Sequence, residues 1–101
     1  MQMKGENGMN VEHVINEVVQ ICKKYSAKQV ILFGSRAKGT ALERSDIDIA
    51  VAGVHDFDCL LEEVEEIPTL YSIDLVDLDT CDNQLLLEDI EQYGCKIFEA
   101  L

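Results

Sequence analysis

The sequence predicts an α/β (α+β) fold in which helices pack against one small, mixed β-sheet. Segments with apolar residues at helical spacing alternate with short apolar segments rich in β-branched residues, a succession typical of layered helix-and-sheet domains. The chain of 101 residues is 48% hydrophobic and contains one proline and six glycines. This composition supplies one hydrophobic core and excludes a disordered, collagen-like or low-complexity chain.

Residues 10–101 are expected to form one domain behind a flexible leader over residues 1–9. The leader is polar and aperiodic and contains three methionines, so that Met1 and Met9 are both candidate start sites. No internal repeat and no linker divides the rest of the sequence, and its length fits a single domain.

The first two elements are predicted to be a helix over about residues 11–25 and a strand over residues 29–33. Asn10 is a suitable N-cap, and apolar residues follow it at helical spacing: Val11, Val14, Ile15, Val18, Cys22 and Tyr25. The strand segment is apolar and β-branched and stops at Gly34, which is typical of a buried strand.

A short helix and a second strand come next. Ser35 is expected to cap a helix from Arg36 to about Leu42, with an interruption near Gly39. Residues 45–51 alternate between polar and apolar side chains, which predicts a strand with one buried face.

The remaining segments are predicted to form a helix, a strand, a helix and a short edge strand, at residues 56–67, 70–78, 82–93 and 96–99. Pro68 ends the first of these helices because proline cannot continue a helix. Asp82 is expected to cap the second helix, and Gly94 to close it.

Charge is distributed unevenly along the chain. Residues 1–44 contain seven Lys or Arg and four Glu, a net charge of +3, whereas residues 45–101 contain sixteen acids and only Lys96, a net charge of −15. A duplex-binding domain needs a broad basic surface, so extended nucleic acid is a poor candidate partner. Apolar runs are far shorter than the roughly 18 residues of a membrane span. We therefore expect a cytoplasmic protein without a membrane segment.

The four cysteines are expected to be reduced and mostly structural thiols. They form no C-x-x-C motif, although an even number leaves disulfides open on counting alone. Neither histidine stands at zinc-ligand spacing from a cysteine or from the other histidine, which argues against a structural zinc site.

The segment that follows the first strand has the features of a phosphate-binding turn. Gly34 has no Cβ and lets the backbone approach a ligand closely. Ser35 offers a hydroxyl and a backbone N–H at the start of a helix, where phosphate is favoured. Arg36 and Lys38 add positive charge at the same place.

Two carboxylates follow this turn, with ten residues between Ser35 and Asp46. Asp46 and Asp48 are two residues apart on a predicted strand, so both project from one face, roughly 7 Å apart along the chain. A third carboxylate should come from a neighbouring strand, where Asp74 and Asp77 point to opposite faces. Asp74 lies within the apolar centre of that strand and is the expected third member. Such a set suits one or two Mg²⁺ ions, with Asp74 helping to deprotonate an attacking hydroxyl.

Each of these features also has a plain structural interpretation, because turns commonly contain Gly-Ser and half-buried strands commonly carry Asp on the wet face. Their combination in this order favours a functional site. Other residues are interpreted as structural: a solvated acidic helix face at Glu62, Glu63, Glu65 and Glu66, and core aromatic residues at Phe33 and Tyr71.

Three segments, at residues 33–39, 45–51 and 73–78, resemble the minimal nucleotidyltransferase family of the DNA polymerase beta-like nucleotidyltransferase superfamily. The departures are mild: Lys38 stands where the family often has Arg, and Ile49 where Leu is common. The resemblance implies the nucleotidyltransferase (polymerase beta-like) fold for nearly the whole chain.

The resemblance also implies an activity, namely Mg²⁺-dependent transfer of a nucleoside monophosphate to a hydroxyl with release of pyrophosphate. The favoured donor is ATP, from which AMP is transferred. The resemblance assigns catalysis and the binding of two Mg²⁺ ions to Asp46, Asp48 and Asp74, and nucleotide binding to Gly34, Ser35, Arg36 and Lys38.

Minimal members of that family resemble antitoxins whose partner is a small helical HEPN-domain protein, which some of them adenylylate on a tyrosine. The short chain leaves no room for a second domain, so the acceptor site would come from that partner or from a second copy in a homo-oligomer. Two alternatives are a non-catalytic acidic protein that neutralises a partner by binding alone, and an antibiotic-modifying transferase, which needs more chain. The sequence leaves the acceptor, the preferred base and the oligomeric state open.

Overall fold

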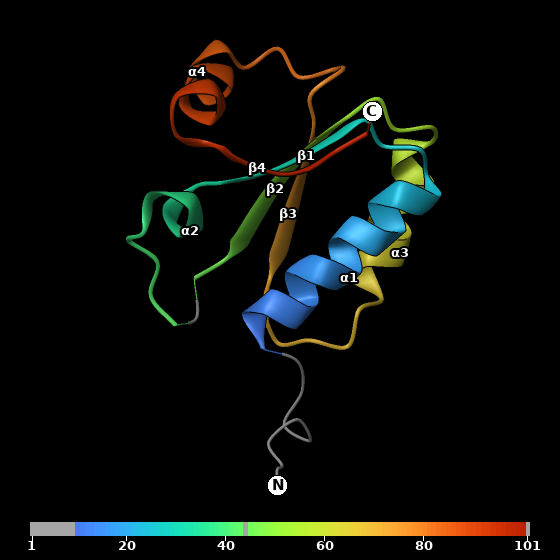
Figure 1. Ribbon diagram of the computed structural model, residues 1–101, viewed down its shortest axis with the longest axis horizontal. Helices are drawn as coiled ribbons and strands as arrows, with labels where there is room; N and C mark the ends of the chain where they lie inside the picture. Colours follow the sequence, from blue (N-terminus) through green and yellow to red (C-terminus); the bar gives the residue numbers. More distant parts are fainter. Residues whose placement is uncertain (1–9, 44, 101) are drawn as a thin grey trace, which may run out of the picture.

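One four-stranded β-sheet organises the chain, with helices on both of its faces (Figure 1). The computed structural model describes residues 10–43 and 45–100, so the expected leader over residues 1–9 lies outside the described residues. The elements are, in order, α1 (Val11–Lys24), β1 (Gln29–Phe33), α2 (Ser35–Lys38), β2 (Ile47–Ala52), α3 (Phe57–Glu65), β3 (Ile73–Asp77), α4 (Gln84–Tyr93) and β4 (Cys95–Glu99).

The sheet is mixed, as the sequence predicts. Its strands lie in the order β3-β2-β1-β4. β1 is antiparallel to both β2 and β4, and β2 is parallel to β3. A parallel pair needs a crossover connection, and α3 provides it between β2 and β3. The last strand, β4, is an edge strand, which confirms the prediction for the end of the chain.

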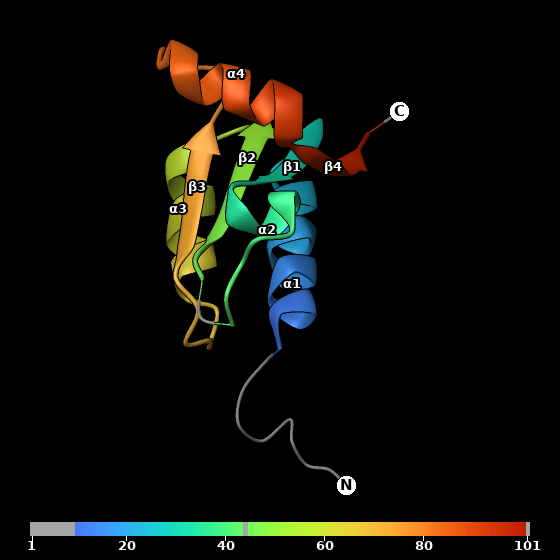
Figure 2. The ribbon, with the colours of Figure 1, turned by 90° about the vertical axis from the view of Figure 1, so that its left-hand side faces the viewer.

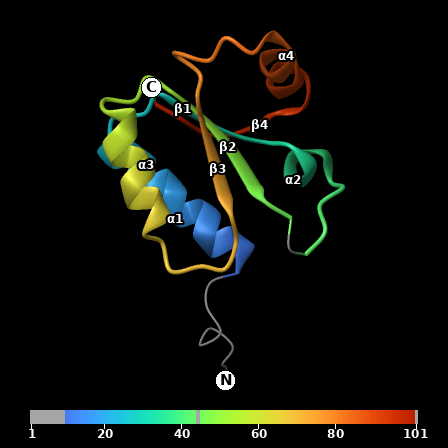
Figure 3. The ribbon, with the colours of Figure 1, turned by 180° about the vertical axis from the view of Figure 1, so that it is seen from behind.

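The main core lies on the face of the sheet that α1 and α3 cover (Figure 3). Val14, Val18 and Leu60 from the two helices meet Ile47 and Ile49 from β2, and all five side chains are fully buried. The side chain of Asn10 accepts a hydrogen bond of 2.9 Å from the His13 N–H, which confirms the predicted N-cap of α1.

α4 packs on the opposite face and covers only one end of it, where β2 and β3 finish (Figure 2). A smaller core forms there from Phe33, Ala50 and Ile90. The other end of this face, where β2 and β3 begin, is not covered by α4. Asp48 and Asp74, the second residues of β2 and β3, lie at that end.

Two interpretations made from the sequence can be compared with the structure: that the cysteines are mostly structural thiols, and that Glu63 lies on a solvated helix face. All four cysteines are free, but Cys59 and Cys95 are exposed, so the structural interpretation does not hold for them. It holds for Cys22, because burial raises the pKa of its thiol to about 11. Glu63 does not belong to a purely solvated face. It accepts a 2.8 Å hydrogen bond from the Tyr25 hydroxyl and pairs with Lys24, joining α3 to α1.

Two predicted helix starts are wrong. Ser35 does not cap α2 but is its first residue, after Gly34, and the helix ends at Lys38 because Gly39 adopts a left-handed conformation. α4 is capped by Asn83 and not by Asp82, with Asn83 Oδ1 accepting from the Leu86 N–H at 3.2 Å. Both Asp and Asn are strong N-cap residues, so neighbouring positions compete and local geometry decides.

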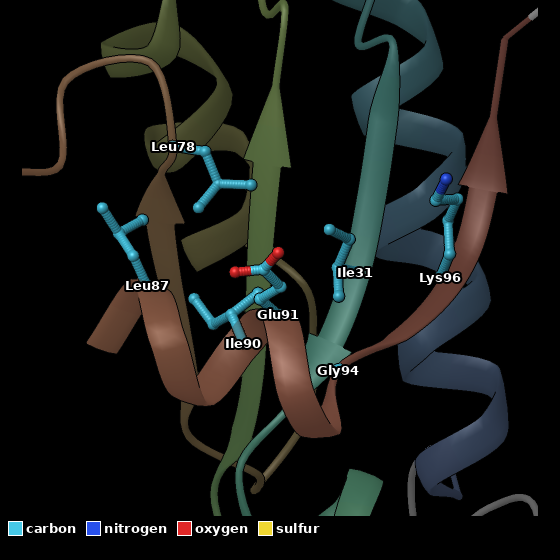
Figure 4. A pocket seen from close by; sticks show the side chains of 7 residues that line it. All are labelled: Ile31, Leu78, Leu87, Ile90, Glu91, Gly94 and Lys96. Atoms are coloured by element: carbon cyan, nitrogen blue, oxygen red, sulfur yellow. The ribbon is translucent and has the colours of Figure 1, made fainter. Parts of the chain in front are cut away.

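Gly94 joins α4 to β4 in a crowded place beside a mostly apolar cavity of about 380 Å³ between α4 and the sheet (Figure 4). Gly94 closes α4 as predicted, with its N–H donating to the Ile90 carbonyl oxygen, but its φ of −65° is open to any residue. A Cβ there would overlap the Ile90 carbonyl oxygen and lie 2.7 Å from Ile31 Cγ2. The position therefore requires glycine for space.

In the described part of the chain, no helix is long and apolar enough to cross a membrane.

We expect Gly94→Ala to lower the free energy of unfolding by about 2–3 kcal/mol, because an inserted methyl group in a packed site forces the backbone to shift. The matched control is Gly39→Ala, where a Cβ meets nothing within 4 Å and only the left-handed φ of +78° opposes it; it should cost about 1 kcal/mol. Urea denaturation of both variants measures the difference. Equal losses would contradict the steric account.

Candidate active site

The parallel pairing of β2 with β3 places two carboxylates side by side. Asp48 is the register partner of Asp74, and Asp77 is the partner of Val51. Val51 is fully buried in the main core. Its partner Asp77 therefore lies on the same face of the sheet as Val51, opposite to the face of Asp48 and Asp74. The structure thus brings Asp74, and not Asp77, beside Asp48, as the alternation along the strand predicts.

Asp46 lies one residue before β2 and is exposed. Its charge contributes to raising the pKa of Asp48, so the two carboxylates are close enough to repel. Among the described residues, however, no three His, Cys, Asp or Glu side chains are arranged to hold a metal ion as they stand. The arrangement is a close pair with a third carboxylate nearby.

Gly34 lies directly against the Asp48 side chain. Phe33 is the register partner of Asp48, so the next residue passes directly beside the Asp48 side chain. Gly34 has a φ of +75°, and a Cβ there would overlap the Asp48 carboxylate. Both the left-handed conformation and the close approach require glycine.

The environment of Asp48 disfavours its charge. Desolvation by the surrounding sheet is the largest cause, and the neighbouring carboxylates of Asp74 and then Asp46 add to it, raising the pKa of Asp48 to about 6. The Arg36 guanidinium acts in the other direction. Two carboxylates sharing one site behave in this way because their negative charges repel.

Arg36 is engaged mainly with the loop that leads to Asp46. Its Nη2 donates to the Ser45 carbonyl oxygen at 2.7 Å and to the Glu43 carbonyl oxygen at 3.2 Å. The guanidinium also lies over the Tyr71 ring, 5.2 Å from its centre. Arg36 Nε is buried and has no hydrogen-bond partner within the residues that the structure describes. One donor of the side chain is therefore still unused.

Lys38 is directed toward α4. Its Nζ lies 3.0 Å from Asp89 Oδ1 and 4.9 Å from the centre of the Tyr93 ring. The predicted part of Lys38 in nucleotide binding stays a prediction, and the structure adds a tie between α2 and α4. No sequence signal pointed to Asp89, because one acid among many on a polar helix face is unremarkable. Tyr71, interpreted as core, is half-buried and packs on Arg36 as well.

A glycine turn, a short helix and adjacent strand carboxylates on a small mixed sheet define a nucleotidyltransferase. The family described as polymerase beta nucleotidyltransferase matches residues 16–100. The chain belongs to this family and is an enzyme of that kind.

Individual relatives agree with this assignment. A protein of Methanocaldococcus jannaschii, provisionally named a protein adenylyltransferase, is 41% identical over an alignment 68 residues long, which covers 64% of this chain and 68% of the relative. A crystal structure of a toxin-antitoxin with AMP-PNP is similar at a TM-score of 0.68 and 25% identity, over 84% of this chain and 73% of the other.

Two further structures share the fold. A toxin-antitoxin MntA-HpeT mutant gives a TM-score of 0.67 at 23% identity, over 84% of this chain and 73% of that one. A nucleotidyltransferase, also provisionally named, from Sulfolobus solfataricus gives 0.56 at 17% identity, over 97% and 90% of the two chains.

The raised pKa of Asp48 makes a prediction about stability without metal. An unfolded aspartate titrates near 3.8 and Asp48 in the folded protein near 6, so the folded state holds the proton more tightly. The free energy of unfolding should therefore fall as pH rises from about 4 to about 6 and stay lower above that. Asp48→Asn removes this loss and should raise the stability of the metal-free protein at pH 7 by about 1 kcal/mol, allowing for solvent screening.

Urea denaturation at pH 4 and pH 7 in the presence of a chelator measures this effect. The gain should be seen at pH 7 and should vanish at pH 4. The matched control is Asp82→Asn, which changes the net charge equally at an exposed loop position. An equal gain in both variants at pH 7 would point to general charge repulsion and not to this pair.

Proposed function

We propose that this protein transfers AMP from ATP to a hydroxyl of a protein partner, with Mg²⁺ as cofactor. The observation that carries the proposal is the Asp48–Asp74 pair, which the register of β2 and β3 holds side by side. Gly34 lies directly against the Asp48 side chain of this pair. Such a pair costs stability in the metal-free protein, and a divalent cation would relieve its repulsion.

The donor set fits Mg²⁺, because carboxylate oxygens together with substrate phosphate oxygens are the ligands that this ion takes. Asp48 and Asp74 would hold it, and Asp46 would join them by a change of side-chain torsions, so that the three could serve two ions. When bound, Mg²⁺ would neutralise charge that develops on the transferred phosphoryl group.

The chain between β1 and α2 is the proposed place of the triphosphate. Gly34 leaves its backbone open beside the carboxylates, and the Ser35 hydroxyl and N–H stand at the start of α2. Arg36 and Lys38 supply positive charge, and the unused Nε of Arg36 is compatible with an anionic ligand. The similar toxin-antitoxin structure with AMP-PNP supports ATP as the nucleotide.

The acceptor would approach over β3. This strand is an edge of the sheet, and Asp74 on it is exposed, so a hydroxyl from another protein can reach its carboxylate. Asp74 would orient that hydroxyl and accept its proton. The toxin-antitoxin structures support a protein partner. The family resemblance of the sequence favours a HEPN-type helical protein as that partner, with the present chain, as a single minimal domain over residues 10–101, in the part of the antitoxin. An intact carboxylate pair gives no support to neutralisation by binding alone.

Transfer should depend on the carboxylate pair. Asp48→Asn and Asp74→Asn should each lower the incorporation of label from α-labelled ATP and Mg²⁺ into a co-purified partner by about 100-fold or more, since each removes a metal ligand. Asp77→Asn is the matched control, because the Asp77 side chain lies on the opposite face, where it accepts a 3.0 Å hydrogen bond from the Asp79 N–H. It should keep activity within about threefold. Wild-type transfer by Asp48→Asn would refute the proposed site.

Association with the partner should be sensitive to salt. Residues 45–101 carry a net charge of −15, which favours a basic surface on the partner. Co-purification should therefore weaken between about 0.1 M and about 1 M NaCl, where the Debye length falls from ~10 Å to ~3 Å. Undiminished recovery at the higher salt concentration would indicate an apolar interface instead.

A further inference from the structure

The residues that precede the carboxylates are held by one side chain. We propose that Arg36 is a positioning residue, whose planar guanidinium fixes the loop before β2 and the segment before β3, and thereby the carboxylates of Asp46 and Asp74. This inference rests on the proposed function for its effect on transfer, but its effect on the loop can be measured without catalysis.

The first contact is with the loop between α2 and β2. Arg36 Nη2 donates to the carbonyl oxygens of Glu43 and Ser45, at 3.2 and 2.7 Å. Ser45 is the residue directly before Asp46. The backbone on which Asp46 is carried is thus tied to α2, although Asp46 itself precedes the first residue of β2.

Ser45, which accepts from Arg36, is also bonded to Leu42. The Leu42 N–H donates to Ser45 Oγ at 2.8 Å, and the Ser45 N–H donates to the Leu42 carbonyl oxygen at 3.1 Å. Because Leu42 is bonded to Ser45 in both directions, the hydrogen bond from Arg36 to Ser45 positions Leu42 as well.

The second contact is with the segment before β3. The Arg36 guanidinium lies 5.2 Å from the centre of the Tyr71 ring. The next residue, Ser72, accepts a 2.9 Å hydrogen bond from the Ile47 N–H, and Asp74 follows two residues later. Arg36 therefore touches both approaches to the carboxylate pair.

Only arginine can make both contacts at once. Its guanidinium is flat, so it stacks on an aromatic ring while its N–H groups donate in the plane. A lysine at this position keeps the positive charge but offers a tetrahedral ammonium that cannot do both. Arg36→Lys consequently separates a positioning role from a role of charge alone, in which lysine would suffice.

The first measurement is amide hydrogen exchange without nucleotide or metal. In Arg36→Lys we expect the amides of Leu42, Ser45 and Ile47 to exchange about tenfold faster than in the wild type, since the loop opens more often. The His55 N–H, which donates to the Tyr25 carbonyl oxygen at 2.8 Å, is the internal reference and should not change.

The second measurement is steady-state transfer from α-labelled ATP to the co-purified partner. Displaced catalytic groups lower kcat and leave ground-state binding intact. Arg36→Lys should lower kcat on the order of 10- to 100-fold, with KM for ATP within about threefold. Lys23→Met is the matched control: it removes a comparable cation–ring contact, 5.2 Å from the Phe98 ring centre, between α1 and β4. It should change neither measurement.

Tyr71→Leu is a second variant that keeps Arg36 and removes the ring beneath it, and it should shift both measurements in the same direction by a smaller factor. Unchanged exchange at Leu42 and Ser45 in Arg36→Lys would overturn the proposal. So would a raised KM with unchanged kcat, which would make Arg36 a phosphate ligand only. Faster exchange in a protein whose wild type transfers nothing would refute the proposed function and leave the loop-positioning role standing.

Discussion

The pairing of β2 with β3 is the constraint on which the site depends. Its register sets Asp48 beside Asp74 and, by the same alternation, turns Ile47, Ile49 and Val51 into the main core. A shift of one residue would bury the acids and expose the core residues. The burial of the apolar side chains therefore holds in place two carboxylates that repel one another, and the free energy that favours the core is what keeps the charged pair together.

The two faces of the sheet have different tasks because their coverings differ. α1 and α3 close one face, whereas α4 closes only one end of the other. The uncovered end is where β2 and β3 begin, and it is bordered by α2 and by the loop that Arg36 holds. The candidate site is thus built from few parts: the sheet, its uncovered end and a glycine that lets the chain pass beside Asp48.

Much of this could be predicted from the sequence, for identifiable reasons. The bounds of β1 follow from an apolar run stopped by Gly34. Strand alternation separates Asp74 from Asp77, and the place of Asp74 in the apolar centre of the strand favours it as the third carboxylate. Local pattern failed where two good residues compete, as at the cap of α4, or where the decisive contact is distant in sequence. The residues around Lys38 do not predict its ion pair with Asp89, and the residues around Arg36 do not predict its contact with Tyr71. Both contacts depend on how α2 is set against the rest of the fold.

The exposed position of Asp74 on β3 has a consequence for solubility. An edge strand presents unpaired backbone groups that can add a strand from another molecule, and charged side chains are a common protection against such aggregation. Asp74 and Asp77 both lie on this edge strand. A carboxylate assigned to chemistry is thus also one of the charges that keep the sheet from extending into a neighbour. Replacing Asp74 removes a protective charge from the edge strand as well as a carboxylate from the candidate site. The activity of such a variant therefore has to be compared at equal concentrations of soluble protein.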